Sequence, residues 1–209
     1  MLTTRAWTRW IGSAELGRKV MVTNPTDAEL VESCLAGQRE SFDTLVARHQ
    51  RHVYQLCYRF VGNHEDASDL AQDVFIRAYR GLSKFKGEAS LGTWLYRIGV
   101  NVCLNKVGAR TPKPQALDPM VAASDERIAS HEESATETLL RGERAGQVRA
   151  AIAKLPKKQR ATLILRIYHE LPHEEIAGIL GSSVGAVKAN FFHALNNLKK
   201  LMTEAGPDR

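Results

Sequence analysis

Cysteine and histidine side chains often bind metals or take part in catalysis, and this 209-residue chain contains both. The cysteines Cys34, Cys57 and Cys103 are far apart and form no CxxC pair, so neither a disulfide framework nor a zinc site is indicated. His49 and His52 have the wrong spacing for a metal pair and no evident carboxylate partner. The chain also has no Walker loop and no nucleophile near a base. We therefore expect a binding protein with no enzymatic activity, no metal and no cofactor.

The stretch from Asn63 to Gly81 predicts one helix with two different faces. On a wheel of 100° per residue, Leu70, Val74 and Ala78 share an apolar side that faces the core. The other side carries an isoleucine among polar residues: Asp69, Gln72, Asp73, Ile76, Arg77 and Arg80. An isoleucine among charges indicates a partner-binding face, yet single exposed isoleucines are also ordinary on protein surfaces. Periodicity alone leaves both interpretations open.

A polar, turn-rich segment, LSKFKGEASLG, and a further helix follow. Cationic and polar side chains in this part of the sequence include Lys84, Lys86, Ser90, Arg97, Asn101 and Asn105. Arg97, Asn101 and Asn105 are spaced i, i+4, i+8 and share one helix face. Trp94 is expected to be a core anchor.

Composition divides the chain into an N-terminal extension (1–25), a helical domain (26–110), an acidic, proline-containing linker (111–141), a second helical domain (142–203) and a C-terminal tail (204–209). The pattern from Thr26 to Glu29 is a capping box that starts the first helix. The sequence contains no pattern typical of β-strands. The predicted fold is therefore all-α, with two small domains joined by a flexible linker. The extension is expected to be disordered, and Met21 is a second possible start of translation.

The net charge of +6 favours an anionic partner, most commonly nucleic acid. The chain contains no run of about eighteen apolar residues and no apolar core of signal-peptide type near its start. We therefore expect a cytoplasmic protein.

The second domain carries a helix-turn-helix pattern. The sequence HEEIAGILG predicts a helix that Gly181 ends, and Ser183 caps the next helix after a short turn. The expected core side of that last helix consists of Val187, Phe191, Ala194, Leu195, Leu198 and Leu201. The opposite side presents Lys188 and its neighbours as a recognition helix does. There Phe192 either contacts a thymine methyl group or is covered by a partner or the linker.

These stretches resemble a known family. DLAQDVFIRAYR and GEASLGTWLYRIGVN are similar to regions 2.2 to 2.4, and LPKKQRATLILR with HEEIAGILG to region 4, of the bacterial sigma-70 family, in particular its extracytoplasmic-function (ECF) group. The resemblance implies a sigma factor that binds RNA polymerase core and directs promoter-specific initiation of transcription. It also implies a restraining anti-sigma factor, which places the protein near the membrane if that partner is membrane-bound.

The resemblance implies three sets of site residues. A coiled coil of the large polymerase subunit is expected to bind Asp69, Gln72, Asp73, Ile76 and Arg77. The single-stranded −10 element is expected to bind Lys84, Lys86, Ser90, Arg97, Asn101 and Asn105. The −35 duplex is expected to bind Ser183, Lys188, Ala189, Asn190, Phe192, His193 and Asn196.

The recognition helix departs from the family pattern. The family reads roughly VKSRLHRA where this chain reads VKANFFHA. Lys188 matches, but the two family arginines fall at Asn190 and His193, and the family histidine falls at Phe192. We therefore expect a different preferred −35 sequence, or weaker and less salt-sensitive binding.

Other departures and alternatives remain. Where relatives often have a run of arginines, this chain has only Lys106 and Arg110. This difference predicts fewer contacts with duplex DNA upstream of the −10 element. A stand-alone helix-turn-helix regulator would explain the last sixty residues but leave the first hundred unused. An interaction protein that binds only a regulator is a second alternative. The sequence also leaves open whether the domains are separate or closed on each other with Phe192 covered.

Overall fold

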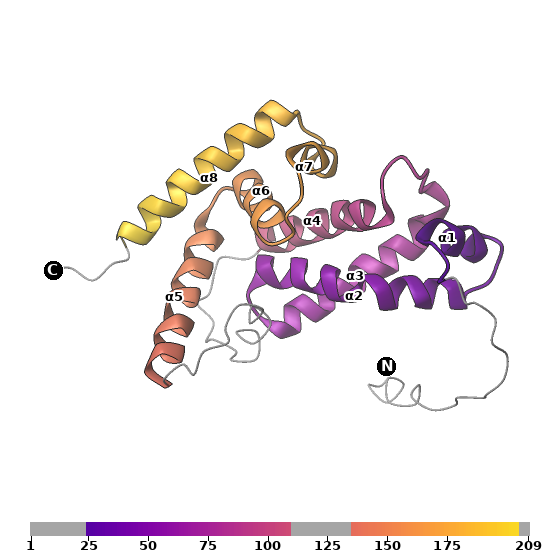
Figure 1. Ribbon diagram of the computed structural model, residues 1–209, viewed down its shortest axis with the longest axis horizontal. Helices are drawn as coiled ribbons and strands as arrows, with labels where there is room; N and C mark the ends of the chain where they lie inside the picture. The colour runs from indigo at the N-terminus through magenta and orange to yellow at the C-terminus, as the bar shows by residue number, and fades with distance from the viewer. Residues whose placement is uncertain (1–23, 110–134, 205–209) are drawn as a thin grey trace.

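The computed structural model describes residues 24–109 and 135–204, and the regular structure in these two ranges is helical, as predicted. Figure 1 labels the α-helices in chain order: α1 (Asp27–Leu35), α2 (Glu40–Val61), α3 (His64–Gly81), α4 (Leu91–Ala109), α5 (Ala135–Lys154), α6 (Lys157–Ile167), α7 (His173–Leu180) and α8 (Val184–Glu204). A short 3₁₀ turn, η2 (Leu82–Lys84), follows α3. The predictions for the N-terminal extension, Met21 and most of the linker lie outside the described residues. Helix α5 begins inside the predicted linker range.

The helix ends follow the local sequence signals. Both hydrogen bonds of the capping box form between Thr26 and Glu29 at the start of α1. The Asn63 side chain caps α3. Gly62 and Gly181 end α2 and α7 in the left-handed conformation, with φ of 77° and 58°, which glycine adopts without steric cost.

Helices α1 to α4 form the first domain, in which α2, α3 and α4 pack on one another. Its most deeply buried side chains include Leu45, Val53, Leu56, Cys57, Phe60, Ala67, Val74, Ala78, Val100 and Cys103. Gly99 permits the close approach of α4 to α2, because a Cβ atom there would lie 2.8 Å from Leu56 Cδ2. Trp94 is partly buried against this core and packs on Phe85, with ring centroids 5.3 Å apart. None of the helices in the described part of the chain has the length and apolar content of a bilayer span.

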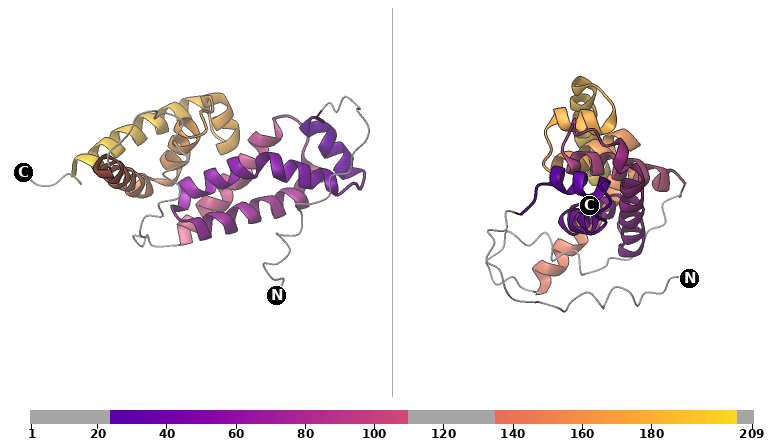
Figure 2. Two further views of the ribbon diagram at one scale, coloured as in Figure 1. Left: turned by 60° about the horizontal axis from the view of Figure 1, so that its bottom comes forward. Right: turned by 90° about the vertical axis from the view of Figure 1, so that its right-hand side faces the viewer.

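Helices α5 to α8 form the second domain, which Figure 2 shows from two further directions as a layer beside the first. Its buried side chains include Ile152, Leu163, Ile164, Leu165, Ile176, Val187 and Ala194. The prediction that Leu195 belongs to this core is wrong, because Leu195 is 42% exposed. It follows the buried Ala194 by one residue, which turns it about 100° around α8 and away from the core.

The two domains are closed on each other. Helix α6 packs on α2, and α7 packs on α4 (Figure 1). Phe192 is not covered by this closure, since it is 61% exposed on the outer side of α8. The closed arrangement therefore occurs without the burial of the recognition helix.

Candidate functional site

The outer face of α3 gathers the five predicted polymerase-binding residues. Asp69, Gln72, Ile76 and Arg77 are exposed, and Asp73 is half-buried. Asp73 and Arg77 form an ion pair along the helix, with Arg77 Nη2 2.8 Å from Asp73 Oδ2. Ile76 stands among these polar groups with 43% of its surface exposed.

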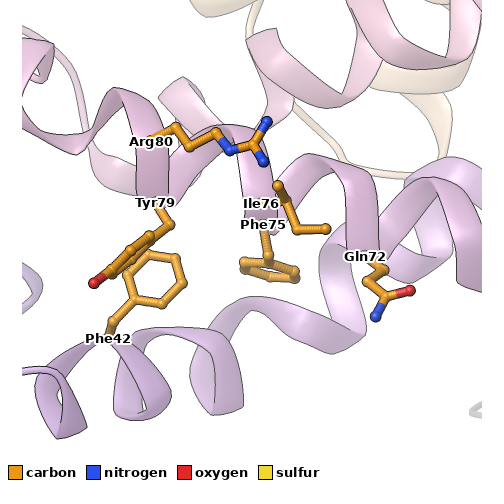
Figure 3. A pocket seen from close by; sticks show the side chains of 6 residues that line it. All are labelled: Phe42, Gln72, Phe75, Ile76, Tyr79 and Arg80. Carbon is orange, nitrogen blue, oxygen red and sulfur yellow. The ribbon is translucent and has the colours of Figure 1, made fainter. Parts of the chain in front are cut away.

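An apolar groove opens beside this face, between α3 and the first turn of α2 (Figure 3). It has a volume of about 410 Å³ and is lined by Phe42, Gln72, Phe75, Ile76, Tyr79 and Arg80. The rings of Phe42 and Tyr79 meet edge to face, with centroids 4.9 Å apart. Sequence analysis missed both residues. Tyr79 could have been found, because it follows Ile76 by three residues, whereas Phe42 comes from a separate helix.

The predicted −10 residues lie along one path. Lys84, Lys86 and Ser90 are exposed between η2 and α4, where the Ser90 hydroxyl accepts a hydrogen bond from the Thr93 amide at 3.1 Å and caps α4. The polar residues of α4 are exposed as well: Arg97, Asn101 and Asn105. From Ser90 to the last of them the path covers about 22 Å, at 1.5 Å per helical residue. Lys106 forms an ion pair within the protein, because its Nζ lies 3.3 Å from Asp66 Oδ1. It is therefore less available than the exposed residues of this path to bind a phosphate.

The predicted −35 residues lie on the outer face of α8. The Ser183 hydroxyl accepts a hydrogen bond from the Ala186 amide at 3.2 Å, which confirms the predicted cap. Six of the seven predicted residues are exposed, namely Ser183, Lys188, Ala189, Phe192, His193 and Asn196, and Asn190 is half-buried. The rings of Phe192 and His193 lie edge to face at 5.8 Å. This face offers one cation and one large apolar ring on a convex helix.

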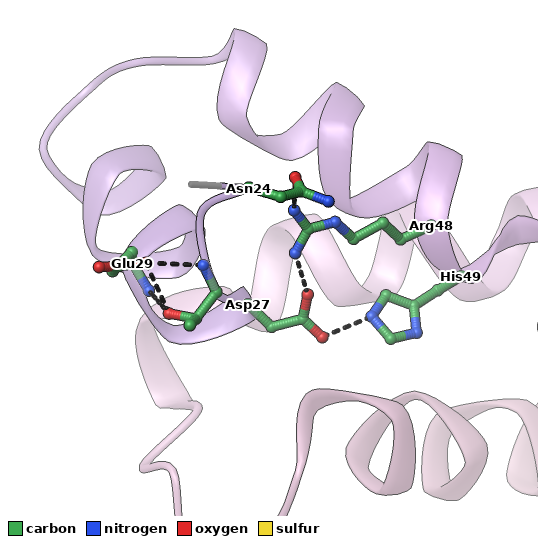
Figure 4. Close-up of polar contacts among 6 residues, drawn as sticks. Asn24, Asp27, Glu29, Arg48 and His49 are labelled. Atoms are coloured by element: carbon green, nitrogen blue, oxygen red, sulfur yellow. Dashed lines mark hydrogen bonds and ion pairs between the residues drawn. The ribbon is translucent and has the colours of Figure 1, made fainter. Parts of the chain in front are cut away.

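The expectation that His49 lacks a carboxylate partner is wrong. His49 Nε2 lies 2.7 Å from Asp27 Oδ2, and Arg48 Nη1 lies 2.9 Å from Asp27 Oδ1 (Figure 4). Although burial raises the pKa of Asp27, the hydrogen bonds from His49 and Arg48 bring it below its usual value. These contacts fasten α1 to α2. Across residues 24–109 and 135–204, no three His, Cys, Asp or Glu side chains converge as metal ligands would.

Cys57 and Cys103 come together in the core of the first domain, although they are far apart in sequence. Both are fully buried free thiols on α2 and α4. The hydrogen bond with Cys57, together with burial, raises the pKa of Cys103 far above that of a free thiol. A thiol in this state is unreactive, so the pair acts as part of the packing.

The two domains coincide with two known sequence families. The model of Sigma-70 region 2 matches residues 45–111, and that of Sigma-70 region 4 matches residues 145–198. The RNA polymerase sigma-H factor of Pseudomonas aeruginosa is 35% identical over 188 residues, which are 87% of this chain and 96% of that protein. The chain belongs to the sigma-70 family. The ECF RNA polymerase sigma-E factor of Escherichia coli is 38% identical over 173 residues, 81% of this chain and 90% of that protein, which places the chain in the ECF group.

Solved structures share the fold of this sigma factor. CnrH in complex with the cytosolic domain of CnrY matches with a TM-score of 0.63 and 25% identity, over 86% of this chain and 99% of that one. RpoE of Bartonella quintana, in complex with the anti-sigma factor NepR, matches with a TM-score of 0.56 and 20% identity, over 80% and 99%. The function of the chain is therefore that of a sigma factor, which binds RNA polymerase and promoter DNA to initiate transcription.

Proposed function

We propose that the three exposed faces divide the work of this sigma factor. The face of α3 binds polymerase core through Asp69, Gln72, Asp73, Ile76 and Arg77. The path from Lys84 to Asn105 holds the melted −10 strand, and α8 reads the −35 duplex. The observation that supports this most directly is Ile76, an isoleucine 43% exposed among charged side chains and beside an apolar groove.

The shape of the groove and the charges around it indicate which kind of polymerase surface could bind there. An amphipathic helix, such as one strand of a coiled coil of the large subunit, can place an apolar side chain against Ile76 and basic side chains near Asp69 and Asp73. The contact would bury an apolar centre within a rim of charges, as stable interfaces commonly do.

The DNA-binding faces use different chemistry. Lys84, Lys86 and Arg97 supply cations to the phosphates of the single strand, and Ser90, Asn101 and Asn105 supply hydrogen bonds to bases and backbone. On α8, Lys188 binds a guanine edge or a phosphate, and Phe192 contacts a thymine methyl group. None of these groups needs to break a covalent bond, so we propose no catalytic step in this chain.

The decisive experiment is a pull-down of RNA polymerase core by the full chain and by Asp73→Arg. The wild-type protein is expected to retain core, and the variant is expected to lose it, because an arginine there repels a basic partner and Arg77. Glu32→Arg is the matched control, since the same charge change in the last turn of α1 favours that helix end. If Asp73→Arg retains as much core polymerase as the wild-type protein does, the outer face of α3 is not the polymerase-binding face and this assignment is wrong.

We also propose an anti-sigma partner that covers the α3 face. CnrH was solved with a cytosolic domain bound, and RpoE was solved with an anti-sigma factor. The same apolar groove suits such a partner, and its occupation would block polymerase. A cytosolic partner domain agrees with action of this chain in the cytoplasm. A protein that co-purifies with the wild-type chain but not with Ile76→Asp, and that displaces core polymerase from the wild-type chain, would support this partner.

A further inference from the structure

The Asp27 carboxylate binds two neighbouring side chains of α2 and is held in one orientation. Its Oδ1 lies 2.9 Å from Arg48 Nη1, and its Oδ2 lies 2.7 Å from His49 Nε2 (Figure 4). Contacts to both oxygens of one carboxylate leave it little freedom to rotate. The contact with Arg48 already joins α1 to α2. The contact with His49 has a further consequence, because it orients an imidazole ring that reaches a third helix.

Another edge of the His49 ring faces the first turn of α4. A Cβ atom added to Gly92 would lie 3.8 Å from His49 Cε1 and 3.9 Å from His49 Nδ1, which is ordinary van der Waals contact. The same position lies 3.8 Å from Ser90 Oγ, the hydroxyl that accepts a hydrogen bond from the Thr93 amide and caps α4. The His49 side chain is only 18% exposed. It therefore lies packed between the Asp27 carboxylate and the start of α4.

This turn of α4 ends an exposed segment, residues 86–90, which belongs to the proposed −10 face. At the other end of the segment, Phe85 packs on Trp94 with ring centroids 5.3 Å apart. A short exposed segment depends for its conformation on the rigid elements that hold its two ends. Trp94 holds one end, and the His49 ring supports the other.

We propose that the Asp27–His49 pair positions the −10 segment, with His49 as a positioning residue for recognition of the −10 sequence. This inference rests on the proposed −10 face. Discrimination between bases requires that the loop that binds them is kept in one conformation. Loss of the His49 ring leaves the first turn of α4 without this support, so the segment can adopt conformations that accept other bases. The effect of His49 on DNA is indirect, since α2 contributes no residue to the proposed −10 face.

The test measures −10 selectivity with holoenzyme assembled from core polymerase and the full chain. Two DNA fragments share a duplex −35 element and carry a single-stranded −10 element. One has the −10 sequence of a promoter selected with the wild-type protein, and the other has one of its bases replaced. The ratio of the two affinities is the selectivity. Binding of core polymerase and the melting temperature of each free variant are measured alongside.

Three single variants are compared with the wild-type protein. His49→Ala removes the ring, whereas His49→Gln keeps an N–H donor that can reach Asp27. His52→Ala is the matched control, because His52 is an exposed histidine three residues further along α2. A double variant, Asp27→Ala/His49→Ala, tests whether Asp27 acts through the ring.

His49→Ala is expected to lose about tenfold in −10 selectivity, which is the discrimination that one base pair commonly supplies, and to bind core polymerase as the wild-type protein does. His49→Gln should retain most of the selectivity, and His52→Ala should retain all of it. The double variant should be no less selective than His49→Ala, because the two residues act as one unit.

A selectivity of His49→Ala equal to that of the wild-type protein would overturn the inference. Equal losses of core binding and −10 selectivity, or a loss that His49→Gln does not restore, would also overturn it and would assign His49 to packing alone. A wild-type holoenzyme that binds both fragments equally is a distinguishable result. It would contradict the proposed −10 face itself, and this inference with it.

Discussion

The outer faces of α3 and α8 each expose one large apolar side chain among polar neighbours. Ile76 is 43% exposed on α3, and Phe192 is 61% exposed on α8. Their surroundings differ, because Ile76 borders a groove and two carboxylates, whereas Phe192 stands on a convex helix with Lys188 one turn away. An exposed apolar residue therefore does not by itself identify a partner. The shape and charge around it separate a protein-binding face from a DNA-binding face.

The largest effect should come from Ile76→Asp. A carboxylate at the centre of a desolvated interface is expected to weaken polymerase binding by about 100-fold, while leaving the fold intact because the side chain is already exposed. Surface-immobilised core polymerase and a titration of the full chain measure this loss.

Ile167→Asp is the matched control for that prediction, because Ile167 is an isoleucine of the second domain that is 51% exposed. It should bind core as the wild-type protein does. Equal losses in the two variants would mean that α3 has no special role, and the contrast between the two faces would disappear.

Acidification should separate the two domains, and with them the outer faces of α3 and α8, without changing the residues of either face. Burial, together with the charges of His52 and Arg59, lowers the pKa of His169 from 6.5 to about 4, and Tyr96 shares its hydrogen bond. Opening of the domains returns the pKa of His169 to its usual value. The open form therefore binds a proton at His169 at a pH where the closed form does not. Between pH 6.5 and 4 a falling pH therefore favours opening, by about 2 kcal/mol or 30-fold at pH 5.

Scattering at pH 7 and pH 5 measures this change as an increase in the radius of gyration. His169→Gln cannot take up the proton, and its radius should be the same at both values of pH. An equal expansion of wild type and variant would assign the effect to other groups.

The features that sequence predicted correctly depend on neighbours within one or two helical turns. The capping box at Thr26, the cap at Ser183 and the exposure of Ile76 are of this kind. What it missed joins distant segments: Phe42 supplies one wall of the groove, and Arg160 is buried against another domain. Spacing along one helix carries no information about which other helix lies opposite. The assignment of functional faces depended on family resemblance, since periodicity alone left Ile76 ambiguous.

Phe192→Ala should weaken binding of the −35 duplex by roughly tenfold, because the ring loses its apolar contact in the major groove. The loss should depend on thymine methyl groups. Replacing thymine by deoxyuridine in the −35 element should weaken the wild-type protein but leave Phe192→Ala almost unchanged. Leu195→Ala, which removes another exposed apolar side chain from α8, is the control and should retain the thymine preference.

The smallest effect should come from Lys188→Gln, and it tests whether α8 binds DNA mainly by charge. Lys188 is the only lysine or arginine between residues 183 and 196, so the face can release few counterions. The substitution should weaken −35 binding only a few-fold, but it should reduce the slope of log affinity against log salt by about 0.9. Fluorescence anisotropy at several salt concentrations measures both quantities. An unchanged slope would show that Lys188 contacts no phosphate, and the affinity of α8 would then depend on Phe192 and on the tethering of both domains to one polymerase.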